Sequence, residues 1–293
     1  MKITILSSSG YKDPKPNYGD CILIDTGKAL VIYDCGSEEH AQRVMDYMTN
    51  TNYDQAIFIL SHNDSDHFNG LPVLLDNNKI SAIGTTLLLK YVDKILERID
   101  DKRKTRESVK RQILDLYDNI KKLSGEPLYD VYENPPELPS GVEFVGPELD
   151  YMLDTVAKRL DGREGNTQDG ETAVNATSLQ VSVDIDGKKL LLCGDSSFSA
   201  IEDKLTAYKI IQLPHHGKVN QAEKIFEKTP VITTSYIVSD NTGDSNGGSD
   251  KLDTKGRRVK NTKDGFDISI EDSVSCNLHS LLITPLAGKT LGE

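Results

Sequence analysis

The chain has 293 residues, a net charge of −12 and an aromatic content of only 6%. This length favours one large domain with insertions and is sufficient to bury a substantial core. The acidic balance argues against a surface that is basic overall, the usual platform for phosphate backbones. No run of eighteen apolar residues occurs and the N-terminus lacks the apolar stretch of a signal peptide, so we expect a cytoplasmic protein that does not bind membranes.

The first eighty residues predict short strands joined by turns. Apolar runs at 2–6, 20–25 and 29–34 precede a helical pattern at 38–48, and the fully apolar AIFIL follows at 56–60. From about 86 to 123, apolar residues at helical spacing predict two charged amphipathic helices that form an insertion. These helices either pack on the core or contact a second copy of the chain or another protein.

A second half rich in strands follows the insertion. After the proline-rich 133–141, runs at 143–146, 178–185, 189–195, 209–217 and 231–238 again predict β-strands. The segment at 240–256 is rich in Asp, Gly, Ser and Asn, so we expect a mobile loop over about 239–263. We therefore expect one α+β domain over residues 1–293, with the helical insertion at about 86–123.

The stretch SHNDSDHFNG at 61–70 concentrates metal-binding side chains directly after a buried strand. His62, Asp64, Asp66 and His67 lie within six residues. Imidazole and carboxylate groups bind divalent cations, and four of them exceed what one tetrahedral ion takes from a single loop. The alternative is a solvated turn, because Asn, Asp and Ser are turn-forming residues.

Two further apolar runs end in residues of the same kind. KLLLCGD brings Asp195 to the end of a strand, and IIQLPHHG brings His215 and His216 to the end of another. Three strands that all end in metal-binding side chains favour a centre with two metal ions over a solvated turn.

The order of these motifs resembles the metallo-β-lactamase fold, specifically the hydrolase domain of the DNA-uptake channel ComEC and its free-standing relatives. The family signature is represented here by H-x-D-x-D-H at 62–67. YGDCILID with VIYDCGS resembles the opening hairpin, and NATSLQV, LPHHG and TKGRRVKNTKDGFDISI resemble later motifs. The resemblance implies an αβ/βα sandwich of two mixed β-sheets flanked by helices.

The resemblance also implies a distribution of ligands between two divalent ions. His62 and Asp64 would hold one ion, Asp66 and His67 the other, and Asp195 would bridge them. One of His215 and His216 would complete the second site. His216 is favoured because related enzymes use a histidine directly before glycine there, and His215 would then support the site. The implied catalytic residues are Asp66, Asp195 and His216.

The first site differs from the usual family pattern. Most relatives place a histidine between the first loop and the bridging aspartate, whereas this chain has none between His67 and His215. Asn175 or Ser178 stands near that position and is a candidate for metal or substrate binding. Carboxylate-rich coordination widens the choice of metal from zinc to manganese.

We expect a phosphodiesterase or nuclease that uses metal-activated water. Two ions suit phosphodiester cleavage, and the chain lacks a phosphate-binding loop and a serine-nucleophile elbow. Lys218, Arg257, Arg258 and Lys260 are candidate substrate-binding residues, either on a phosphate track or in a solvated hairpin. The alternatives are a small phosphodiester of the cyclic-nucleotide type, a lactone or thioester, and a metal-stabilised interaction module.

Several other residues and segments have more than one interpretation. Asp20 and Asp34 either support the loop at 61–70, called the metal loop below, or have an ordinary turn or strand-end role. His40 is expected to be structural or exposed, and Cys193 a buried core thiol. The loop at 239–263 either clamps substrate or covers the site, and its basic half offers bonds that a trypsin-like protease cuts in an exposed chain.

Overall fold

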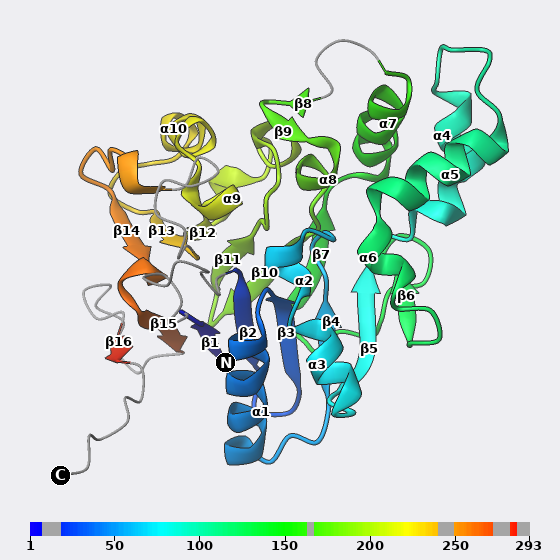
Figure 1. Ribbon diagram of the computed structural model, residues 1–293. Coiled ribbons are helices and arrows are strands. Elements are labelled where there is room, and N and C mark those ends of the chain that lie inside the picture. The colour runs from blue at the N-terminus through cyan, green and yellow to red at the C-terminus, as the bar shows by residue number, and fades with distance from the viewer. Residues whose placement is uncertain (8–18, 163–166, 240–248, 272–281, 286–293) are drawn as a thin grey trace.

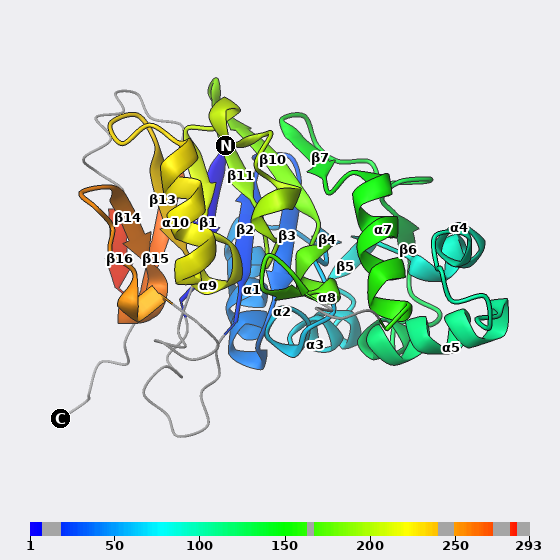
Figure 2. The same ribbon diagram turned by 90° about the horizontal axis from the view of Figure 1, so that it is seen from above.

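Two mixed β-sheets lie against each other and carry helices on their outer faces, as Figure 1 and Figure 2 show. The computed structural model describes residues 1–7, 19–162, 167–239, 249–271 and 282–285, and the structural statements below concern these residues. This architecture confirms the α+β sandwich of two mixed sheets that the sequence predicts.

The larger sheet has eight strands in the order β16-β15-β1-β2-β3-β4-β5-β6. Strands β3 to β6 pair in parallel, whereas β16, β15, β1, β2 and β3 pair in antiparallel fashion. The strands span β1 Lys2–Ile5, β2 Cys21–Asp25, β3 Leu30–Cys35, β4 Ala56–Ile59, β5 Ile80–Thr85, β6 Leu128–Asp130, β15 Phe266–Glu271 and β16 Leu282–Pro285.

The smaller sheet has six strands in the order β14-β13-β12-β11-β10-β7, and a two-stranded hairpin, β8-β9, is separate from it. Strands β11 to β14 are parallel, and β7 and β10 extend the sheet in antiparallel fashion. The strands span β7 Val142–Gly146, β8 Thr167–Gln168, β9 Glu171–Thr172, β10 Gln180–Ile185, β11 Lys188–Leu192, β12 Ile210–Gln212, β13 Ser235–Val238 and β14 Arg258–Asn261.

The alternation of side chains along the strands builds two of the core layers. In β2, Ile22 and Ile24 join the cluster between the sheets, while Cys21 and Leu23 pack toward the helices on the outer face. This two-residue period follows from the pleat of a strand. Cys193 is buried in a third cluster, behind the smaller sheet, and the prediction of a core thiol is confirmed.

Helices cover the outer faces of both sheets. Helix α1 (Glu38–Thr51) begins at Ser37, whose side chain accepts a hydrogen bond from His40 N, and α3 (Leu71–Asp76) lies on the same side. His40 is fully buried and its Nε2 lies 3.1 Å from Ser7 O, so its role is structural. Helix α10 (Val219–Lys228) covers the smaller sheet.

The predicted insertion forms helices with a core of their own. A 3-10 turn (Leu88–Tyr91) leads into α4 (Val92–Glu97), α5 (Arg106–Leu116) and α6 (Asp118–Lys121), and their apolar side chains pack with α7 (Leu149–Leu160). Helix α5 ends earlier than the sequence pattern predicts. Tyr117 leaves the helical conformation, with φ −121° and ψ 51°, and its hydroxyl lies 3.3 Å from Thr177 Oγ1.

The segment predicted as a mobile loop is partly regular. Residues 240–248 lie outside the described residues, whereas 249–263 contain a 3-10 turn and β14, which extends the smaller sheet. The predicted strand at 231–238 is shorter than expected, because residues 231–233 form a turn in which Ile232 is 77% exposed. Within the described ranges, no helix has both the length and the apolar character needed to cross a membrane.

Candidate metal centre

The three predicted metal-binding segments meet where the two sheets come together. The loop after β4 leads into the short helix α2 (Ser65–Phe68), and its Ser61 carbonyl accepts a hydrogen bond from Leu179 N at the start of β10. His215 N donates to Gly194 O, which ties α9 (Pro214–Gly217) to the loop after β11. Segments far apart in the sequence therefore bring their side chains to one place.

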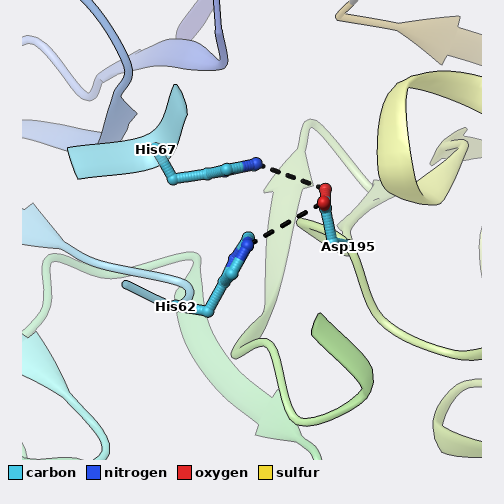
Figure 3. Close-up of side chains that lie close together, drawn as sticks. All are labelled: His62, His67 and Asp195. Carbon is cyan, nitrogen blue, oxygen red and sulfur yellow. Dashed lines mark ion pairs between the residues drawn. The ribbon is translucent and has the colours of Figure 1, made fainter. Parts of the chain in front are cut away.

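Asp195 lies between two histidines of the first loop (Figure 3). Its Oδ1 is 3.3 Å from His67 Nε2, and its Oδ2 is 3.8 Å from His62 Nε2. The two imidazole rings face the carboxylate from α2 and from the loop before it, and their centroids are 4.1 Å apart. One carboxylate thus presents a separate oxygen to each histidine, the arrangement expected of a bridging ligand.

A second group of donor atoms adjoins the first. Asp66 Oδ2 is 2.9 Å from His216 Nε2, and together with His67 these residues could hold a metal ion. The rings of His67 and His216 are stacked with centroids 5.8 Å apart. Asp64 lies at the edge of the site, with its side chain 44% exposed and its Oδ2 3.7 Å from His62 Nε2.

The donor set fits a metal centre. His62 Nε2, His67 Nε2 and Asp195 Oδ1 are buried and have no hydrogen-bond partner among the described residues. A buried polar atom without a hydrogen bond is costly, and three such atoms that face one another are better explained by a ligand than by packing. Imidazole nitrogen and carboxylate oxygen together suit zinc and other first-row divalent ions.

Two buried aspartates hold the histidines in place. Asp34 Oδ2 accepts a hydrogen bond from His67 Nδ1 at 2.8 Å, and its Oδ1 accepts one from Ser61 N at 2.7 Å. His216 Nδ1 lies 2.9 Å from the carbonyl of Ser239 and 3.4 Å from Asp20 Oδ1. Of the two interpretations of Asp20 and Asp34, the geometry therefore supports the one in which they hold the metal loop, since such contacts leave Nε2 facing the candidate metal centre.

The opening hairpin approaches the metal loop so closely that two glycines are required. The carbonyl oxygen of Asp66 accepts a hydrogen bond from Asp20 N. A Cβ at Gly19 would lie 2.1 Å from that oxygen, and one at Gly36 would lie 1.9 Å from it. Any other residue at either position would displace the loop that carries the predicted ligands.

Asn175 and Ser178 both contact the centre. Asn175 Nδ2 donates to Asp195 Oδ2 at 3.1 Å, and Ser178 Oγ lies 3.1 Å from His62 Nδ1. Asp195 N also donates to Ser178 Oγ. Both side chains thus orient predicted ligands.

His215 belongs to a polar cluster that the sequence pattern does not reveal. Its Nδ1 is 2.6 Å from the buried Glu171 Oε2, and its Nε2 is 3.8 Å from Asp195 Oδ2. Glu171 also accepts hydrogen bonds from Lys218 and Gln221. Glu171 stands alone in a polar stretch, and no motif identifies it. His215 therefore faces Asp195, whereas His216 faces Asp66.

The predicted basic substrate residues have different environments. Lys218 pairs with Glu171, and the Arg257 guanidinium lies over the Phe226 ring, 4.7 Å from its centroid. Arg258 is exposed at the start of β14, and Lys260 is paired in register with Ile237, two residues before Ser239. The carboxyl end of β14 thus lies beside the segment that contacts His216.

Opposite charges set the protonation of the centre. Burial disfavours the charged form of His67, but the carboxylates of Asp195 and Asp34 outweigh it and raise the pKa well above its usual value. The pKa of His216 is raised in the same way, against burial, by Asp20 and Asp66. Burial alone would raise the pKa of Asp195, yet His67 and His215 hold it well below its usual value. The metal-free centre is therefore held together by imidazolium–carboxylate pairs.

We expect the stability of the metal-free protein to fall as the pH rises above about 6.5. The folded-state pKa values of His67 and His216 lie above the unfolded value of about 6.5, so their stabilisation is complete below that pH and is lost as the pH approaches the folded values. Stabilisation by added metal should instead increase with pH, because binding displaces these protons. Denaturant unfolding at pH 6 and pH 9, with either chelator or metal added, measures the stability of the metal-free protein and the stabilisation by metal. A metal-free protein that is more stable at pH 9 than at pH 6 would contradict the expectation.

The helical insertion is attached directly to the metal loop. Asn119 Nδ2 donates to the carbonyl oxygen of Asn63 at 2.6 Å, and Asn63 Nδ2 donates to Leu116 O at 3.3 Å. Asn63 lies between His62 and Asp64 and is 4% exposed. The α5–α6 junction thus fixes the backbone that carries two predicted ligands.

Asn119→Ala is expected to weaken metal binding by roughly tenfold, because side chains that orient ligands typically contribute 10–100-fold to affinity. The matched control is Asn77→Ala, whose exposed amide donates to Val73 O on α3, away from the metal loop. Competition with a chromophoric chelator measures the affinity of each variant. Equal affinities for the Asn119 and Asn77 variants would show that the contact does not position the loop.

Comparisons with known proteins agree with this fold. A family model described as the metallo-beta-lactamase superfamily matches residues 14–239. The metallo-beta-lactamase fold protein YhfI from Bacillus subtilis is similar, with 13% identity, a TM-score of 0.53, and coverage of 92% of this chain and 98% of that chain. A metallo hydrolase from the archaeon Ignicoccus hospitalis has 11% identity and a TM-score of 0.50, and covers 92% and 99% of the two chains. No curated protein matches the sequence.

Proposed function

Because the chain belongs to the metallo-beta-lactamase superfamily and is a metal-dependent hydrolase, we propose that it cleaves phosphodiester bonds in DNA or RNA. We also propose that the chain belongs to the ComEC-like subgroup of this superfamily, because it carries the motif H-x-D-x-D-H at 62–67. The observation that supports it most is the position of Asp195, which offers one oxygen to each side of the centre. A bridging carboxylate suits a pair of ions, and a pair of ions suits phosphodiester hydrolysis.

The ligands divide into two sets around this carboxylate. His62 and Asp64 would hold the first ion, and Asp66, His67 and His216 would hold the second, with Asp195 between the two sets. His216 is preferred to His215 because its Nε2 adjoins Asp66 and His67, whereas His215 Nε2 adjoins only Asp195 Oδ2. When bound, two zinc or manganese ions would lower the pKa of water and stabilise both the attacking and the leaving oxygen.

The protein's own residues orient this chemistry. Asp34 holds Nδ1 of His67, and Ser178 and Ser61 hold Nδ1 of His62, so each ring presents Nε2 to the centre. Asn175 restrains Asp195 Oδ2. The buried Cys193 thiol has its pKa raised by burial, which excludes it as a ready nucleophile. In the proposed reaction, a water molecule activated by the ions would be the nucleophile.

Substrate binding is proposed at the end of the site beside β14. Lys260 provides positive charge near the segment that contacts His216, and the exposed Arg258 lies farther away, at the start of β14. Their role would be to bind phosphate groups along a strand. Arg257 lies on Phe226 and is expected to contribute less.

A panel of substrates tests the proposal. Metal-loaded protein is incubated with supercoiled plasmid, single-stranded DNA, RNA, bis(p-nitrophenyl) phosphate and a lactone, and the double variant Asp66→Ala, His67→Ala is run beside it. Cleavage of a nucleic acid by the parent alone supports the proposal. Hydrolysis of only the lactone, or equal cleavage by the double variant, would overturn it.

A further inference from the structure

A cavity of about 430 Å³ lies in the helical insertion, outside the metal centre. It is lined by the segment after β5 on one side and by the α5–α6 junction on the other. Figure 1 shows these segments near the β5–β6 edge of the larger sheet. Its apolar wall comprises Leu87, Leu88, Ile113, Leu114, Tyr117 and Ile120. The volume falls within the range of small-molecule sites, about 300–1,000 Å³.

The cavity opens to solvent. Leu89, another of the lining residues, is 43% exposed, and Leu87 and Leu114 are only half-buried. Covering such surface is favourable, because it removes apolar area from water. An apolar ligand would therefore gain binding energy there.

The polar edge of the cavity is positively charged. Lys90 and Lys121 both line it. Lys90 Nζ is bound to Glu133 and Asn134. The ammonium group of Lys121, within the part of the chain described, has neither an ion pair nor a hydrogen bond, and the residue is exposed. Apolar walls with an unneutralised cation at the edge are complementary to a molecule that has an apolar body and a negative end.

We propose that this cavity binds a small amphiphilic anion, of the chemistry of a medium-chain carboxylate. The apolar body occupies the space between Leu87 and Ile120, and the anionic end pairs with Lys121. Tyr117 both lines the cavity and contacts Thr177, and Asn119 in α6 holds the metal loop. The ligand would thus lie next to the α5–α6 junction that holds the metal loop, and outside the catalytic centre.

Calorimetric titration with decanoate tests the site. Ser124→Phe places an aromatic ring on the lining at an exposed position, and Leu114→Trp fills the cavity from α5; each should weaken binding at least tenfold. Lys121→Ala should weaken binding roughly fivefold, the upper range for one exposed ion pair, whereas the exposed control Lys110→Ala should not change it. Circular dichroism establishes that each variant is folded.

The ligand's charge and its place of binding are tested separately. Decyltrimethylammonium, which has the opposite charge, should bind at least fivefold more weakly than decanoate. The Asp195→Asn variant should bind decanoate as the parent does, because Asp195 does not line the cavity. If decanoate instead bound to metal ions at the catalytic centre, this variant would lose the binding together with the ions. Absence of saturable decanoate binding, equal binding of the cation, or unchanged binding by both filling variants would overturn the proposal, whatever the outcome for nuclease activity.

Discussion

Asp195→Asn is expected to reduce cleavage of bis(p-nitrophenyl) phosphate by at least about 1,000-fold. Asp195 is 2% exposed and faces His62, His67 and His215. Its loss removes the shared negative charge that would hold two cations together. Metal ions supply several kcal/mol of transition-state stabilisation, and about 4 kcal/mol corresponds to a factor of about 1,000. Steady-state kinetics with metal analysis of the same sample measures the effect.

The matched control for this substitution is Asp203→Asn, whose carboxylate is exposed and pairs only with Lys204 among the described residues. It should retain the parent's rate and metal content. An Asp195 variant that keeps more than a tenth of the parent's rate, with its metal content unchanged, would show that the carboxylate does not bridge the centre.

Asp34→Ala is expected to lower metal affinity by about 10–100-fold without removing any direct ligand. The fully buried carboxylate binds His67 Nδ1 and Ser61 N, so its loss frees the ring to rotate and leaves a backbone donor unpaired. Asp34→Asn should recover part of the affinity, because its amide oxygen can still accept one of these hydrogen bonds. Competition with a chelator measures the metal affinity of the parent, of Asp34→Ala and of Asp34→Asn.

Asp150→Ala provides the control, since that carboxylate is 84% exposed on α7. If Asp34→Ala binds metal as tightly as the Asp150 variant, the contact with His67 has no part in metal binding. If Asp34→Asn and Asp34→Ala are equally weak, the carboxylate charge matters and the geometry of the hydrogen bonds does not.

The sandwich and the segments that meet at the site could be predicted because their signals are local. Buried strands are continuous apolar runs, such as 56–60, and the side chains that follow them must lie at a sheet edge. His62, His67 and Asp195 are recognisable from their place directly after such strands. The same reasoning places His215 and His216 after β12, and their left-handed φ values of 51° and 53° turn them toward the centre.

The remaining residues of the site could not be predicted because their partners are distant in sequence. Glu171 contacts His215 across 44 residues, and Asn119 reaches Asn63 across 56. Neither has a pattern of its own, since a single buried carboxylate or amide resembles a surface residue until its partner is known. The break at Tyr117 was also unpredictable, because the apolar stripe continues through it.

A crystal structure of the metal-loaded protein, with ions located by anomalous scattering, tests the central claim most directly. We expect two ions about 3.5–4 Å apart, one beside His62 and the other beside His67 and His216, with an Asp195 oxygen bound to each. A single ion, or two ions that Asp195 does not touch, would contradict it.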